Sequence, residues 1–213
     1  LAQALHGVQR CLSTNMLHLS DCTKCPRIVK NFKKLRLMYP SLINKPIAPR
    51  STNSTFLCII GLAPGLFGAN RTGKIFDGDF SGNILNKALN VARYTNNSIN
   101  TYPHITNAVK CLPPLNKPSS SEITNCNAYL KYELNSLSNL KVIIAFGLVA
   151  HKAVLKVYEK KIKKYNFSHG AIHKINNNLT LIDSYHCSKI NVNTKRLSMP
   201  MIIDILELAR LYR

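Results

Sequence analysis

Four cysteines in the chain are spaced so that they could bind one metal centre. Cys22 and Cys25 form a C-x-x-C pair, and Cys111 and Cys126 form a second pair with fourteen residues between them. Thiolates two residues apart can reach one centre from a single turn, and four thiolates suit zinc or a [4Fe–4S] cluster. The wide second spacing is not that of a zinc ribbon or finger, so zinc is less favoured. Four unrelated buried thiols are the remaining alternative.

Disulfide bonds are not expected in this chain. It contains 7 cysteines, an odd number, and it shows neither a signal peptide nor an apolar run long enough to cross a bilayer. Cys58 lies inside an apolar run and is predicted to be a core residue, whereas Cys11 and Cys187 have no obvious partner. Residues 1–20 contain no acidic side chain, so a processed start or the remnant of an organellar import segment is kept as an alternative.

A glycine-rich segment, residues 61–82, embeds an aromatic side chain and two carboxylates. It reads GLAPGLFGANRTGKIFDGDFSG and contains Phe76, Asp77 and Asp79. Its glycines would let the backbone approach a ligand closely. It contains neither the G-x-G-x-x-G of a dinucleotide fold nor the closing G-K-[ST] of a P-loop, so a nucleotide cofactor is disfavoured.

The charge of the chain indicates a polyanionic partner. Lys and Arg number 29 against 9 Asp and Glu, a formal net charge of +20. Binding to nucleic acid phosphates would release counterions and weaken steeply with salt. A compositional bias toward Lys, Asn and Ile is the alternative, but the scarcity of acidic residues favours nucleic acid. The basic run 156–164 is too short for a membrane-surface helix, so no membrane partner is expected.

The elements that position these residues alternate between strand and helix patterns. Such alternation predicts a parallel sheet with helices on both faces, and the length fits a single domain, residues 1–213. Ser119 to Ser121 offer N-cap oxygens, and Glu122 lies in the first turn of the helix that follows. The Lys- and Asn-rich segment 156–178 is interpreted as a helix end and an exposed loop. Strands are expected at 56–62, 105–109, 142–146 and 179–182, and helices at 25–38, 82–94, 121–137, 148–157 and 200–211.

The ligand site of an open α/β sheet lies at the carboxyl ends of its strands. Four segments of this chain follow predicted strands and should therefore meet at one edge of the sheet. These segments are 61–82, 107–118, 147–151 and 186–196.

Three of these segments together resemble the motif set of the family 5 (type b) uracil-DNA glycosylases. They are GLAPGLFGANRTGKIFDGDFSG, TNAVKCLPPLNKP and SYHCSKINVNTKRLS. The cysteines Cys22, Cys25, Cys111 and Cys126 also match that family and its family 4 relatives, which implies a [4Fe–4S] cluster. The resemblance further implies a three-layer α/β/α fold with a central four-stranded parallel sheet. The implied activity is to flip uracil, or another deaminated or modified base such as hypoxanthine, out of DNA and to hydrolyse its N-glycosidic bond, leaving an abasic site.

The resemblance also implies roles for particular residues. The base pocket would comprise Gly61, Ala63, Phe76, Asn107 and His186. Phe76 would stack on the base, Asn107 would read its hydrogen-bonding edge, and His186 would donate a hydrogen bond to the departing anion.

Water activation and DNA contact follow from the same resemblance. Related families carry a carboxylate where this chain has Leu62-Ala63, so Asp79 would either orient water or polarise the sugar, or merely cap a helix. Phosphate contacts are expected from five side chains, Arg71, Lys74, Ser188, Lys189 and Arg196.

Two functions from different classes are carried forward. The first is a monofunctional glycosylase, which we expect to be a monomer in the cytoplasm, associated with the nucleoid. The second is a DNA-binding protein that captures damaged bases with little or no turnover because its activating carboxylate is missing. An electron-transfer iron–sulfur protein is less favoured, because the cysteines of such a protein usually lie closer together in the sequence than those of this chain.

Overall fold

A single sheet forms the centre of the protein. The structure, a computed structural model, describes residues 19–50, 54–95 and 102–213. The strand order is β2-β1-β3-β5-β4, in which the first four strands are parallel and β4 runs antiparallel to β5. The strands are β1 (Leu57–Gly61), β2 (His104–Asn107), β3 (Val142–Phe146), β4 (Ile172–Asn176) and β5 (Leu179–Ser184).

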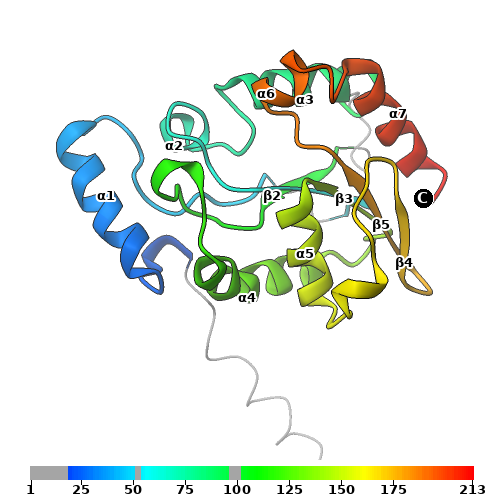
Figure 1. The fold of residues 1–213 in the computed structure, drawn as a ribbon, viewed down its shortest axis with the longest axis horizontal. Coiled ribbons are helices and arrows are strands. Elements are labelled where there is room, and N and C mark those ends of the chain that lie inside the picture. The colour runs from blue at the N-terminus through cyan, green and yellow to red at the C-terminus, as the bar shows by residue number, and fades with distance from the viewer. Residues whose placement is uncertain (1–18, 51–53, 96–101) are drawn as a thin grey trace, which may run out of the picture.

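Helices cover both faces of this sheet (Figure 1). α3 and α7 lie on one face with the short α6 nearby, and α4 and α5 lie on the other, so the predicted three-layer α/β/α fold is confirmed. α1 and α2 lie at one end of these layers. The helices are α1 (Pro26–Met38), α2 (Ala69–Thr72), α3 (Phe80–Val91), α4 (Ser120–Ser136), α5 (Leu148–Val157), α6 (Lys189–Asn193) and α7 (Met199–Arg210).

The central strands are apolar on both faces because helices cover both. Ile59 in β1 is in register with Ile105 in β2 and with Ile144 in β3. All three are fully buried and pack in the core under α3 and α7. The alternate residue Cys58 is buried on the opposite face, under α4 and α5, as predicted for a core cysteine. Continuous burial of this kind is what makes parallel strands recognisable in a sequence.

The antiparallel edge strand β4 departs from the sequence analysis. It occupies residues 172–176, inside the segment interpreted as a helix end and a loop. Its residues alternate in exposure, and only Ile175 is fully buried among them. The rest of that segment contains a short 3-10 helix, Ile162–Lys164. The sheet therefore has the four predicted parallel strands and one further strand at its edge.

The start of α4 follows the predicted N-cap. Ser119 Oγ accepts a hydrogen bond from the backbone N–H of Glu122, and Glu122 Oε2 accepts one from the backbone N–H of Ser119. This capping box satisfies two N–H groups that the helix end would otherwise leave free. Glu122 also pairs with Arg27 of α1 at 2.7 Å. The pair ties α1 to α4 close to Cys25.

Part of the chain lies outside the described residues, and two expectations from the sequence fall there. The possible import segment lies largely in residues 1–18, and Cys11 lies there too, outside the described residues. Among the helices in the described ranges, none combines the length and the apolar character needed to cross a membrane.

Candidate active site

A pocket of about 550 Å³ opens at the carboxyl ends of the parallel strands. Its volume is in the range of sites that enclose one small ligand. Three of the four predicted segments line it. Segment 147–151 does not, because it starts α5, which packs on the opposite face of the sheet. The pocket brings together six predicted residues, namely Ala63, Phe76, Asp79, Asn107, His186 and Ser188.

Gly61 does not line this pocket itself but lies directly beside two residues that do, Asn107 and Phe76. It is the last residue of β1 and is in register with Asn107, the last residue of β2. A Cβ atom at position 61 would lie 2.5 Å from Asn107 Oδ1 and 2.8 Å from the ring of Phe76. Real Cβ atoms do not approach other atoms so closely, so a side chain here would displace both residues. Glycine at this position therefore lets the amide and the ring converge.

Phe76 and His186 form an aromatic wall. Their ring centroids are 6.3 Å apart and their planes differ by 29°. Phe76 has a φ of +52°, a left-handed conformation that costs a non-glycine residue about 1–2 kcal/mol. Asn86 Nδ2 donates a hydrogen bond of 2.9 Å to the Phe76 carbonyl, which helps to hold this backbone. Strained residues of this kind concentrate at functional sites.

The carboxylate of Asp79 has two different surroundings. Oδ1 accepts a hydrogen bond of 2.8 Å from the backbone N–H of Gly82 and caps α3. Oδ2 points toward the loop, since a Cβ at Gly65 would lie 3.2 Å from it and one at Gly68 would collide with it. Asp79 also lines the pocket. One carboxylate can therefore cap the helix and present its second oxygen to a ligand.

His186 is poised as a neutral hydrogen-bond donor. Burial lowers the pKa of His186 below its ordinary value, and the nearby carboxylate of Asp79 only partly opposes that effect. Its backbone carbonyl accepts a hydrogen bond of 2.7 Å from Asn191 Nδ2, which fixes the loop. The imidazole of a neutral histidine carries one N–H, which can point at charge developing on a bound base.

The five predicted phosphate-binding residues differ in the contacts that their side chains make. Arg71 is exposed, but its guanidinium donates to the carbonyls of Phe67 and Gly78 and braces the glycine-rich loop. Arg196 lies over the ring of Tyr185 at 4.4 Å. Ser188 caps α6, while Lys74 and Lys189 are exposed. Of the five, Ser188 lines the pocket itself.

Sequence reasoning missed part of the pocket rim. Leu115 is 89% exposed and Ile190 is 75% exposed, and both line the pocket. Leu115 and Asn116 adopt consecutive left-handed conformations, with φ of +56° and +55°. In the sequence, Leu115 is a leucine in a loop bounded by prolines, and this was the available sign of an apolar side chain at the surface. The other pocket residues that were not predicted are Leu62, Pro64, Gly65, Ala69, Ser81, Asn116 and Lys117.

The four predicted metal-binding cysteines line a second cavity, away from this pocket. It is formed by Cys22 and Cys25 before α1, Cys111 after β2, and Cys126 in α4, with Tyr129 beside them. Two donors approach the sulfurs. The backbone N–H of Lys110 lies 3.3 Å from Cys126 Sγ, and Asn125 Nδ2 lies 3.7 Å from Cys25 Sγ. Hydrogen bonds to sulfur are a feature of thiolates that bind metal clusters.

Burial makes free thiolates unfavourable in this cavity. Among the described residues, no three of its sulfurs lie within 4.8 Å of one another. Burial raises the pKa of Cys126 to about 11, and burial together with neighbouring thiols raises the pKa of Cys111. Thiolates here would thus need a cationic centre to neutralise them.

The fold and the pocket are those of a base-excising class of DNA enzymes, and the sequence comparisons agree. Residues 50–210 match the model of the uracil DNA glycosylase superfamily. The chain belongs to this superfamily.

Relatives within the superfamily share most of their length with this chain. The type-5 uracil-DNA glycosylase of Pyrobaculum aerophilum is 33% identical over 204 residues, which span 90% of this chain and 88% of that protein. The type-5 enzyme of Thermus thermophilus is 31% identical over 201 residues, 88% of this chain and 92% of that protein. A type-4 uracil-DNA glycosylase of P. aerophilum is 33% identical over 147 residues, 68% of this chain and 65% of that protein.

Proposed function

We propose that this protein is a monofunctional uracil-DNA glycosylase of the type-5 class. It flips uracil out of DNA, and with it hypoxanthine or other deaminated bases, and hydrolyses the N-glycosidic bond to leave an abasic site. The observation that carries the proposal is the convergence of Phe76, Asn107 and His186 in one pocket at the sheet edge. These groups supply a stacking ring, an amide and a neutral N–H donor, which are what an extruded base requires.

Base capture rests on Phe76 and Asn107. An extruded base loses a few kcal/mol of stacking and pairing, which the pocket has to return. The Phe76 ring offers a stacking face. The Asn107 side chain is almost fully buried and offers one acceptor and two donors, which match the alternating edge of uracil. Because Gly61 carries no side chain, both groups can reach the same base.

Bond cleavage depends on stabilising charge. When the bond between the sugar C1′ and the base nitrogen breaks, its electron pair leaves with the base, and positive charge develops on the sugar. His186 donates its N–H to the oxygen that becomes negative, a contribution of about 100- to 1,000-fold when such a donor acts alone. A water oxygen then bonds to C1′ and releases a proton to solvent, which completes the hydrolysis.

Asp79 has the position to assist this water or the cationic sugar. Leu62 and Ala63 line the pocket without offering a carboxylate. The Oδ2 of Asp79 is directed to the loop, and its negative charge would favour an oxocarbenium-like sugar. Asp79 therefore acts as both helix cap and electrostatic partner.

Four basic residues and Ser188 would hold the DNA duplex. Lys74, Lys189, Ser188, Arg71 and Arg196 would contact phosphates and set the register of the duplex. Leu115 and Ile190, exposed at the rim, would fill the gap that the flipped nucleotide leaves, as apolar wedges do in other proteins that unstack DNA.

A [4Fe–4S] cluster held by Cys22, Cys25, Cys111 and Cys126 completes the protein. The common cavity and the two N–H donors support it. If bound by these cysteines, a cluster would link the start of α1, the loop after β2 and α4. These four cysteines bind it for structural purposes, and the base pocket works through other residues. We further propose that residues 1–213 form one domain that acts as a monomer, in the cytoplasm with the nucleoid.

A second function, capture without turnover, is favoured by one observation. Asp79 is the carboxylate that lines the pocket, and its Oδ1 is already engaged with Gly82. A protein with this site could bind a flipped base and release it intact. Duplexes with uracil, with hypoxanthine or without a lesion separate the two functions when abasic sites are revealed by alkaline cleavage. Lesion-dependent breaks support the glycosylase, and tight lesion binding without breaks supports capture.

A further inference from the structure

Two histidines and an aspartate meet in a place that the glycosylase chemistry does not use. His151 comes from α5, His173 from β4 and Asp183 from β5. Their side chains are 1%, 12% and 0% exposed. Among the described residues, they form the group of three whose ligand atoms all lie within 4.8 Å of one another. None of the three lines the base pocket or the cysteine cavity.

Both ring nitrogens of His151 have a hydrogen-bonding partner. His151 Nε2 lies 3.1 Å from the carbonyl oxygen of Tyr165, which can only accept, so Nε2 carries a proton. His151 Nδ1 lies 2.8 Å from Asp183 Oδ1, and His173 Nε2 lies 2.9 Å from Asp183 Oδ2. A neutral His151 would thus direct a lone pair at a carboxylate. Either an additional proton or a metal cation must lie between them.

The arrangement of the outer groups matches that of a metal-binding histidine. Such a histidine usually donates its second ring N–H to a carbonyl or carboxylate, which fixes the tautomer and the ring orientation. The Tyr165 carbonyl does this for His151. Aromatic rings also wall the group, since Phe167 lies 5.6 Å from the His151 ring and Tyr165 lies 5.7 Å from the His173 ring. These rings lower the local dielectric and strengthen binding of a cation to the carboxylate.

We propose that His151, His173 and Asp183 bind a divalent cation of the zinc class. Two imidazoles and one carboxylate are a donor set that zinc and cobalt accept, whereas calcium and magnesium require oxygen and iron–sulfur clusters require thiolates. The metal forms bonds to His151 Nδ1, to His173 Nε2 and to an oxygen of Asp183. His151 loses its Nδ1 proton to solvent, and His173 keeps its proton by moving it to Nδ1.

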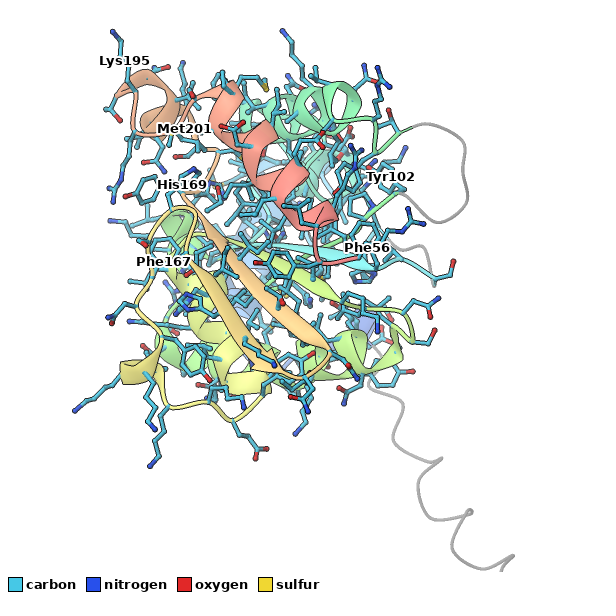
Figure 2. All side chains as sticks on the ribbon, turned by 90° about the vertical axis from the view of Figure 1, so that its right-hand side faces the viewer. Phe56, Tyr102, Phe167, His169, Lys195 and Met201 are labelled. Carbon is cyan, nitrogen blue, oxygen red and sulfur yellow. The ribbon has the colours of Figure 1, made fainter. Side chains whose placement is uncertain are left out.

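Metal entry requires a small expansion of the group. Tetrahedral zinc with bonds of about 2.1 Å sets ligand atoms roughly 3.4 Å apart, more than the 2.8 Å and 2.9 Å of the hydrogen-bonded state. His173 can supply that movement because it is partly exposed and lies on the edge strand. Figure 2 shows Phe167 and His169 on the chain that leads into this edge, beside the β4–β5 pair. The cation would connect β4 and α5 to β5. Its ligand in β5, Asp183, lies three residues before His186.

Zinc titration calorimetry on untagged protein tests the proposal, and His173→Gln is the main variant. Glutamine can still donate to Asp183, so the hydrogen-bonded structure is kept while the nitrogen ligand is lost. His169→Gln is the matched control, since His169 is a neighbouring histidine outside the group. The cysteines are the same in all three proteins, so any zinc that they bind cancels in the comparison.

The wild type and His169→Gln should bind one more zinc ion than His173→Gln. The variant's affinity at this site should fall by more than the roughly 10- to 100-fold that the loss of an outer partner costs. Titrations in two buffers of different ionisation enthalpy should show one proton released per ion. Cobalt added to the wild type should give the visible absorption bands of a cobalt ion bound by nitrogen and oxygen. This measurement uses the wild type alone, so it does not depend on how a variant folds. Equal zinc binding by wild type and His173→Gln, or no such cobalt bands, would overturn the proposal and leave the three side chains as a hydrogen-bonded group.

Discussion

The ammonium group of Lys110 donates a hydrogen bond of 2.8 Å to the backbone carbonyl of Asn107. Lys110 is fully buried, and the same group also donates to Glu133 at 2.7 Å and to Thr106 at 2.6 Å. The backbone N–H of Lys110 reaches Cys126 Sγ. One residue therefore connects the cysteine cavity, α4 and the backbone of Asn107, whose side chain we assign to base reading.

Replacing Lys110 by Met should disable the protein in two separable ways. Glu133 would be left as a buried carboxylate without its lysine partner, which costs about 3–5 kcal/mol of unfolding free energy. Adding Glu133→Gln removes that charge, so stability should recover in part, while Asn107 still lacks its carbonyl contact. Urea unfolding and single-turnover excision measure the two effects. A double variant with wild-type excision would show that the contact to Asn107 is not needed.

The lowered pKa of His186 predicts a pH-dependent difference between the wild type and His186→Gln. Because the folded state disfavours the protonated ring, the unfolded chain binds more protons below the ordinary histidine pKa of 6.5. The wild type should therefore lose stability relative to the variant as the pH falls below 6.5, and the difference should become constant above it. Urea unfolding at a series of pH values measures this difference, and a difference that is independent of pH contradicts the lowered pKa.

The sequence was informative where burial is continuous and where residue types are diagnostic. The runs that became β1 and β3 were recognisable because both faces of these strands are covered, and the Ser119–Glu122 box marked the start of α4. β4 was missed because its exposed face carries Lys and Asn residues that also suit a loop. The His151–Asp183 contact and the exposed position of Leu115 depend on tertiary arrangement, which no local pattern specifies.

Asp79 allows its two roles to be separated by substitution. Asparagine is as good an N-cap as aspartate, so Asp79→Asn should keep stability, whereas Asp79→Ala should lose about 1 kcal/mol. If the charge assists the sugar cation, both variants should lose excision, measured in single turnover. Full activity in Asp79→Asn together with lower stability in Asp79→Ala would reduce Asp79 to a helix cap.

Leu115→Ala should impair excision from duplex DNA more than from a single strand. A single strand has no base pair to open, so a side chain that fills the vacated stack matters only in the duplex. Leu37→Ala is the matched control, because Leu37 is 86% exposed on α1 and does not line the pocket. Excision rates on paired and unpaired uracil give the ratio. An equal reduction on both substrates would assign Leu115 to some role other than base extrusion.

Cys126→Ser should lose the colour of an iron–sulfur cluster together with stability and excision. The cluster would cross-link α1, α4 and the loop after β2, so removal of one ligand loosens all three. Cys58→Ala is the control, since Cys58 is equally buried but lies in the core under α4 and α5. Visible absorption and iron content should change in the first variant only, and thermal unfolding should change more in the first variant than in the control. A colourless, stable and active Cys126→Ser protein would contradict a structural cluster.

The most direct test of the account is single-turnover excision from a uracil-containing duplex by the wild type, His186→Gln and Asn107→Ala, with lesion binding measured in parallel. The wild type should generate abasic sites only in duplexes that contain the lesion. His186→Gln should still bind the lesion but cut about 100- to 1,000-fold more slowly, as expected for a lost donor to the departing anion. Asn107→Ala should lose binding as well. Tight lesion binding by the wild type without abasic sites, or undiminished excision by His186→Gln, would contradict the account.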